Sequence, residues 1–352
     1  MINTEQNTQA SKSITSNEQL SVLRITALWA FSESAFGGIL HALTVPLRGL
    51  FIASAAVLFI SLIALFSKNN KDVLKATLIV VLIKAVVSPH SPLTAYLAVS
   101  LQGVLGFLFF STKKFYKLST LLLGLLVLFL SGLQKIIILT ILFGNTLWES
   151  LNLFIEQVSS EFLGITNPDI NYGYFLVGIY LSLHVAAGLF IGIYAGKLPN
   201  KIDYYKKVVP TLIENNIIED IPKKGSRKKK NWFLRPTGIF IILLSAGVIV
   251  LSYSSDELEN NAAVSVIFML VRALMITFIW YYLLAPFFKK LFQKFAAKRK
   301  SVYSKEIEEI MSMFPQFKKI VNFCWKNSKN KKGLKRIRYF LSTSFYYLLL
   351  SK

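Results

Sequence analysis

The chain has 352 residues, of which 54% are hydrophobic and 14% are aromatic, and its formal net charge is +22. These hydrophobic fractions exceed those of ordinary soluble domains, so a soluble globular protein is excluded and an integral membrane protein is predicted. The single cysteine excludes an intramolecular disulfide framework, and the basic residues lie in blocks between long apolar runs, a pattern that indicates membrane topology before nucleic-acid binding.

Residues 1–20 are polar and lead directly into an apolar run, so we expect a disordered tail and not a cleaved signal peptide. A membrane helix needs roughly 20 apolar residues. Runs of about that length predict eight spans, near Val22–Leu43, Gly49–Phe66, Val73–Ser88, Pro92–Phe110, Leu118–Phe143, Tyr174–Ala195, Gly238–Tyr253 and Ala263–Phe287. The predicted fold is therefore an all-α, polytopic membrane bundle.

The distribution of basic residues predicts which loops face the cytoplasm. Lysines occur between the second and third spans and between the fourth and fifth, eleven Lys/Arg lie between Lys197 and Arg235, and seventeen lie between Lys289 and Lys352. The segment Gly144–Gly173 has no Lys or Arg and carries four acidic residues. The alternation predicts cytoplasmic termini in a plasma (inner) membrane protein, with residues 41–48, 88–92 and 144–173 outside.

The turn Ser88–Pro92 is explained by its two prolines. Pro89 ends the third span, because proline disfavours a helical conformation at the residue before it, and Pro92 fits the first turn of the fourth span. The prolines therefore need no functional explanation. His90, within this turn, and Lys84, about one turn below it, are not explained in this way.

Ionisable residues inside predicted spans are costly and are commonly functional. Lys84, Glu33, Lys135, His184 and Arg272 all lie within spans. One interpretation is internal pairing, in which Glu33 neutralises Lys84, Lys135 or Arg272. The other is a pocket in the outer half of the bundle, where positive charge exceeds negative charge and would attract an anionic or zwitterionic solute. The candidate solute-binding residues are Glu33, His41, Arg48, Lys84, His90, Lys135 and His184.

Metal and catalytic sites are not predicted. His184 is placed several turns deeper than His41 and His90, which argues against a shared metal site. The sequence has no nucleotide-hydrolysing Gly-rich loop and no paired carboxylates for acid–base catalysis, so we expect neither an enzyme nor a bound cofactor.

Small residues recur every four positions in two predicted spans: Ala30, Ser34, Gly38 and Ala42 in the first, and Gly188, Gly192 and Gly196 in the sixth. Such stripes let helix backbones approach closely in lipid. They serve either packing within the bundle or docking onto a partner subunit.

The region "ESAFGGILHALTVPLRGLF", followed by "LKATLIVVLIKAVVSPHSPLTAYLAVSLQGVLGFLFF", resembles the substrate-binding subunits of energy-coupling-factor vitamin transporters. The resemblance covers roughly residues 22–196. It implies a six-helix bundle whose outward pocket is closed by residues 41–48, 88–92 and 144–173. It also implies that Ala30, Ser34, Gly38 and Ala42 dock onto a membrane scaffold subunit and that separate ATPases supply energy.

Beyond the bundle of residues 21–196, we expect a basic cytoplasmic loop at 197–236, two further spans within 237–288 and a basic interfacial tail at 289–352. Basic and aromatic residues beside a membrane are typical of segments that bind anionic lipid headgroups. A surface helix is predicted for Ser304–Val321. The leading hypothesis is uptake of a small anionic or zwitterionic nutrient or cofactor precursor. The alternatives are a non-transporting scaffold whose basic regions bind lipids or a partner, and a membrane enzyme acting on a lipid-linked substrate.

Overall fold

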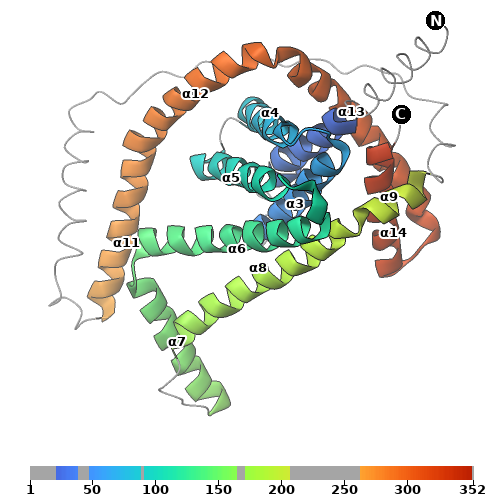
Figure 1. The fold of residues 1–352 in the computed structure, drawn as a ribbon. Helices are drawn as coiled ribbons and strands as arrows, with labels where there is room; N and C mark the ends of the chain where they lie inside the picture. The colour runs from blue at the N-terminus through green and yellow to red at the C-terminus, as the bar shows by residue number, and fades with distance from the viewer. Residues whose placement is uncertain (1–20, 39–46, 89–90, 165–170, 207–261, 351–352) are drawn as a thin grey trace, which may run out of the picture. The chain divides into compact units, whose positions relative to one another are not determined.

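The computed structural model describes residues 21–38, 47–88, 91–164, 171–206 and 262–350 (Figure 1). His41, Ala42, His90, the tail 1–20, most of the basic loop 197–236 and the expected span Gly238–Tyr253 lie outside these residues. Within the described ranges the chain forms helices and turns, with no strand. The all-α class is therefore confirmed for this part of the chain.

The first helix covers residues 21–31 and continues into a π-helix, η1 (Ser32–Phe36). The other elements, in chain order, are α3 (Arg48–Phe66), α4 (Lys71–Val87), α5 (Leu93–Phe109), η2 (Lys113–Phe115), α6 (Tyr116–Phe143), α7 (Thr146–Leu163), α8 (Tyr172–Gly196), α9 (Leu198–Lys206), α11 (Ala262–Ile279), η4 (Trp280–Leu284), α12 (Ala285–Val302), α13 (Ser304–Asn327), η5 (Ser328–Asn330) and α14 (Gly333–Leu350).

Four helical segments of the described chain are long and apolar enough to cross a membrane: α3, α6, α8 and Ile267–Val302, which joins most of α11 to η4 and α12. The eight predicted spans are thus not confirmed. Helices α4 and α5 have 17 residues each, which at 1.5 Å per residue gives about 26 Å, less than the roughly 30 Å of a bilayer core.

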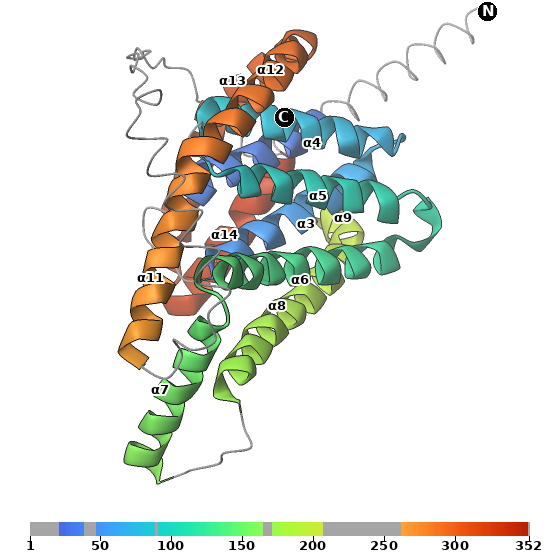
Figure 2. The same cartoon turned by 90° about the vertical axis from the view of Figure 1, so that its left-hand side faces the viewer.

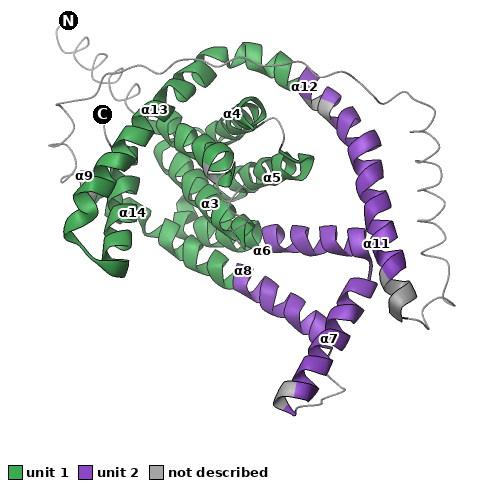
Figure 3. Cartoon of the chain, turned by 180° about the vertical axis from the view of Figure 1, so that it is seen from behind, with its two compact units in different colours: residues 1–128, 185–220, 295–352 green, residues 129–184, 221–294 purple. Residues whose placement is uncertain are grey.

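The chain divides into two compact units (Figure 3). Unit 1 comprises residues 1–128, 185–220 and 295–352, and unit 2 comprises residues 129–184 and 221–294. The long helices α6 and α8 each contribute one part to unit 1 and the other part to unit 2.

The core of unit 1 is built from the first helix and α3, α4 and α5 (Figure 2). Its fully buried side chains are large and apolar, with Trp29, Ile60 and Leu82 among them. Helix α4 is apolar on nearly all sides and buries nine of its residues. A helix that is hydrophobic all round belongs in the interior of a bundle, which agrees with this position.

The basic tail packs onto unit 1. The structure has α13 where a surface helix was predicted, and the apolar side of α13 is buried through Ile307, Ile310, Phe317, Ile320 and Cys324. Phe31 of the first helix meets the rings of Phe314 and Phe317, with ring centroids 5.5 and 6.5 Å apart. This face of α13 therefore contacts protein, where the sequence pattern alone is equally compatible with a lipid surface.

One ion pair joins α13 to α4. The Lys75 Nζ lies 3.0 Å from Glu306 Oε1. Burial opposes ionisation of Glu306, but the hydrogen bond and the positive charge of Lys75 outweigh it, so the pKa of Glu306 is lowered. Both side chains are partly exposed, and we expect such a pair to contribute about 0–1 kcal/mol to stability.

The segment Gly144–Gly173, which we expect outside the membrane between two spans, is helical over most of its length. Residues Thr146–Leu163 form the amphipathic helix α7, which contacts α11 within unit 2. Its apolar residues recur at helical spacing, as in Leu147, Leu151 and Ile155, while its three glutamates disfavour a membrane-spanning position. The side of the membrane on which α7 lies stays a prediction.

Candidate functional site

Glu33 and Lys84 form a buried ion pair in unit 1. The Lys84 Nζ donates a hydrogen bond to Glu33 Oε2 at 2.7 Å, and the side chains are only 7% and 2% exposed. Glu33 comes from η1, and Lys84 comes from the last turn of α4. The structure thus selects Lys84 from the three cations that could have neutralised Glu33.

Glu33 lies in the π-helical turn η1. Single π-helical turns inside α-helices are rare and are frequently found at functional sites. Here the turn Ser32–Phe36 places Glu33 and Ser34 inside the bundle, both buried. Among the described residues, neither Glu33 Oε1 nor Ser34 Oγ has a hydrogen-bond partner. The site therefore keeps an unused carboxylate oxygen and an unused hydroxyl beside the ion pair.

A short series of hydrogen bonds connects this turn to α4 and α5. The Ser88 Oγ donates to the Ser34 carbonyl at 3.3 Å, and the Tyr96 hydroxyl donates to the Ser88 carbonyl at 3.2 Å. Ser88 is the residue after α4, and Tyr96 lies in the first turns of α5. Sequence reasoning missed Ser34, Ser88 and Tyr96 as parts of the site. Ser88 and Tyr96 were marked only by their proximity to the Ser-Pro-His-Ser-Pro turn, whereas Ser34 was marked only as a member of the small-residue stripe.

Buried apolar residues flank the pair along both of its helices. Trp29 and Ala30 precede Glu33 by about one turn, Val81 and Ile83 neighbour Lys84 on α4, and all four are buried. Removing two charges from water costs several kcal/mol per ion, and their attraction repays this cost only when the geometry is good. A protein in which apolar residues of similar volume replace such a pair is often equally stable. Stability alone is thus a weak reason for charges at this position.

Arg48 and Lys135 do not join the pair. Arg48 is exposed at the first residue of α3, and Lys135 is exposed on α6. Their role in solute binding stays a prediction. Lys135 and His184 belong to unit 2, while Glu33, Lys84 and Arg48 belong to unit 1. The predicted set is therefore not shown to form one site.

His184 occupies a packing position. Its ring is buried, its Nδ1 lies 2.9 Å from the Tyr180 carbonyl, and its ring centroid is 4.4 Å from that of Tyr180. A Cβ placed at Gly132 would lie 2.9 Å from His184 Cγ, so the glycine on α6 makes room for the imidazole. The contacts of His184 are those of a histidine that joins α8 to α6 within unit 2. The described residues contain no cluster that could hold a metal ion.

Arg272 has a structural partner in unit 2. Its side chain on α11 is buried, and its Nη2 donates a hydrogen bond to the carbonyl of Phe143, the last residue of α6. The final carbonyls of a helix lack partners within the helix and carry partial negative charge, so a guanidinium stabilises them. This contact accounts for a cation in a predicted span without any ligand.

The two small-residue stripes differ in their packing. Ala30 and Ser34 are buried against this chain's own helices, whereas Gly38 is exposed. In α8, a Cβ at Gly188 would lie 2.6 Å from the Gly124 carbonyl oxygen, and one at Gly192 would lie 2.8 Å from the Thr120 carbonyl oxygen. The α8 stripe therefore packs against α6 inside the protein. Docking of the first stripe onto a partner stays a prediction.

Comparison with known protein families, with curated proteins and with solved structures finds no match to this chain.

Proposed function

We propose that the protein binds a small, charged or zwitterionic solute at the Glu33–Lys84 pair and takes part in its uptake across the membrane. The observation that carries the proposal is the buried pair, in which Glu33 Oε1 and Ser34 Oγ have no hydrogen-bond partner among the described residues. Apolar residues could replace both members of such a pair without loss of stability, and ionisable residues inside predicted spans are commonly part of a solute or ion path.

The chemistry of the site defines the solute class. Glu33 Oε1 accepts a hydrogen bond, so the solute carries an N–H or O–H donor, and a cationic amine satisfies it best. Lys84 offers three N–H donors, of which one is used by Glu33. An anionic group on the solute competes with Glu33 for Lys84. A zwitterion can therefore engage both residues and replace the protein's own pair with two ligand contacts.

The direction of entry follows from the sequence. The positive-inside pattern places the Ser88–Pro92 turn outside, and Lys84 is one helical turn below it. The resemblance to the substrate-binding subunits of energy-coupling-factor transporters agrees with a solute site near this turn. In that arrangement a membrane scaffold subunit and separate ATPases would supply the energy. We include those partners in the proposal.

Solute depletion from the growth medium tests this function. Cells of the source organism carrying Glu33→Gln/Lys84→Met are compared with wild-type cells in a defined mixture of charged nutrients, followed by mass spectrometry of the medium. We expect the double variant to deplete one charged or zwitterionic component at least about tenfold more slowly, because a charge pair contributes more than about 1.4 kcal/mol to binding.

The matched control is Lys75→Met, which removes a lysine and an ion pair from the same helix at a partly exposed position. It should deplete every component at the wild-type rate. Equal depletion of every component by the double variant and the wild type would contradict the proposal.

A further inference from the structure

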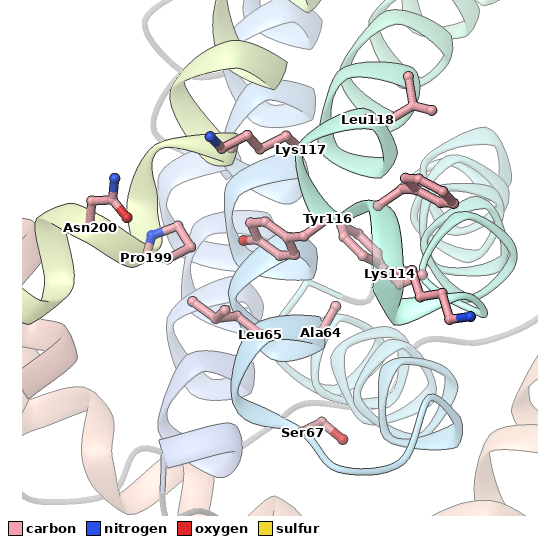
Figure 4. Close-up of a pocket in the computed structure, with 12 residues that line it drawn as sticks. Ala64, Leu65, Ser67, Lys114, Tyr116, Lys117, Leu118, Pro199 and Asn200 are labelled. Atoms are coloured by element: carbon pink, nitrogen blue, oxygen red, sulfur yellow. The ribbon is translucent and has the colours of Figure 1, made fainter.

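A cleft of about 690 Å³ lies in unit 1, at the C-terminal ends of α3 and α5 (Figure 4). Its lining comes from the end of α3, the end of α5, the start of α6 and the junction between α8 and α9. α3 ends at Phe66, α6 begins at Tyr116 and α8 ends at Gly196, so three of the four candidate spans have one end here. Ends of spans lie at the boundary between hydrocarbon and water.

The lining of the cleft is amphipathic. The walls include Leu65, Phe110 and Phe115, and the rim carries Lys114 and Lys117 with no acidic residue in the lining. Figure 4 shows the Tyr116 ring in the cleft, with the side chains of Lys114 and Lys117 extending to opposite sides of it. Its hydroxyl donates to the Ser61 carbonyl at 3.1 Å and its ring centroid is 5.5 Å from that of Phe110, which fixes the apolar wall.

The two lysines are available to a ligand. Both are exposed, and neither ammonium group pairs with a carboxylate within the described part of the chain. They are three residues apart: Lys114 lies in η2, and Lys117 lies in the first turn of α6. The positive-inside pattern assigns this end to the cytoplasmic leaflet, whose surface is negative because of its anionic lipids.

We propose that this cleft binds an anionic phospholipid, with the headgroup at the rim that carries Lys114 and Lys117 and an acyl chain along the apolar wall. A soluble phosphate compound would use the lysines but would leave the apolar wall empty. Phe115 and Leu118 beside the lysines are 62% and 51% exposed, and such side chains at a membrane boundary favour a ligand with a hydrocarbon part. This site is separate from the Glu33–Lys84 pair and does not depend on the proposed uptake.

The test uses the full-length protein in a neutral detergent, with phosphatidylglycerol and phosphatidylcholine as probes. Retained lipid is counted by native mass spectrometry, and thermal stability is followed in parallel. We expect phosphatidylglycerol to bind at least tenfold more tightly than phosphatidylcholine. At about 1 kcal/mol for each lysine near the surface, Lys114→Gln/Lys117→Gln should weaken phosphatidylglycerol binding about thirtyfold.

Lys298→Gln/Lys318→Gln is the matched control, because both lysines are exposed and neither lines the cleft. It should change binding less than about twofold, within the range of surface substitutions. The proposal is overturned if the Lys114/Lys117 variant keeps its affinity for phosphatidylglycerol. It is also overturned if inorganic phosphate displaces the lipid at equal concentration, since the site would then bind a soluble anion.

Discussion

Replacing Lys84 by methionine should lower the free energy of unfolding by about 3–5 kcal/mol, because it leaves Glu33 as a buried charge without its partner. The carboxylate would keep both oxygens in an apolar setting, with Trp29 and Ala30 packed about one turn before it. The same substitution at Lys75, on the same helix, removes a partly exposed pair and should cost about 1 kcal/mol or less. Thermal unfolding in detergent measures both.

The double variant Glu33→Gln/Lys84→Met separates structure from function. Removing both charges removes the unpaired ion, so most of the lost stability should return. If the pair is only structural, solute uptake returns with it. If the pair binds solute, uptake stays lost in a protein that folds normally. A Lys84→Met variant no less stable than Lys75→Met would show that the Glu33–Lys84 pair is not formed in the folded protein.

Gly188→Ala is expected to destabilise the protein by about 1–3 kcal/mol, since one methyl group would force the α6 and α8 backbones apart. A Cβ at Gly188 would lie 2.6 Å from the Gly124 carbonyl oxygen and 3.1 Å from Leu125 Cα. Both neighbours are backbone atoms, so no flexible side chain can move aside. Close approach of this kind is the packing that small residues provide between membrane helices.

Gly178→Ala supplies the control on the same helix. Nothing lies within 4 Å of a Cβ at Gly178, and alanine in a helix interior is more stable than glycine by about 0.5–1 kcal/mol. The same change should therefore raise the thermal midpoint at Gly178 and lower it at Gly188. A rise at both positions would contradict the close packing of α6 and α8.

The membrane class and the helical fold could be predicted from the sequence because long apolar runs decide them directly. The partner of Glu33 could not, since Lys84 is 51 residues away and the choice among three cations depends on tertiary packing. Arg272 instead bonds the Phe143 carbonyl, and Lys135 is exposed. Intramembrane charge alone does not distinguish a ligand contact from a helix cap.

Charge and apolar spacing carry different information about the segment after α6. Its acidic charge predicts a side of the membrane, whereas the spacing of its apolar residues indicates the helix α7. The cleft at Lys114 and Lys117 could not be anticipated, because its walls come from helix ends more than 130 residues apart in the sequence, such as Ala64 and Asn200. Only the folded arrangement brings them together.

The most direct test of the proposed solute site is mass spectrometry of small molecules that co-purify with the protein in mild detergent. Wild type, Glu33→Gln/Lys84→Met and Lys75→Met are purified in parallel from the same cells. We predict one charged or zwitterionic small molecule in the wild-type and Lys75→Met samples, and its loss from the folded double variant. The same set of small molecules in all three samples would contradict binding at the Glu33–Lys84 pair.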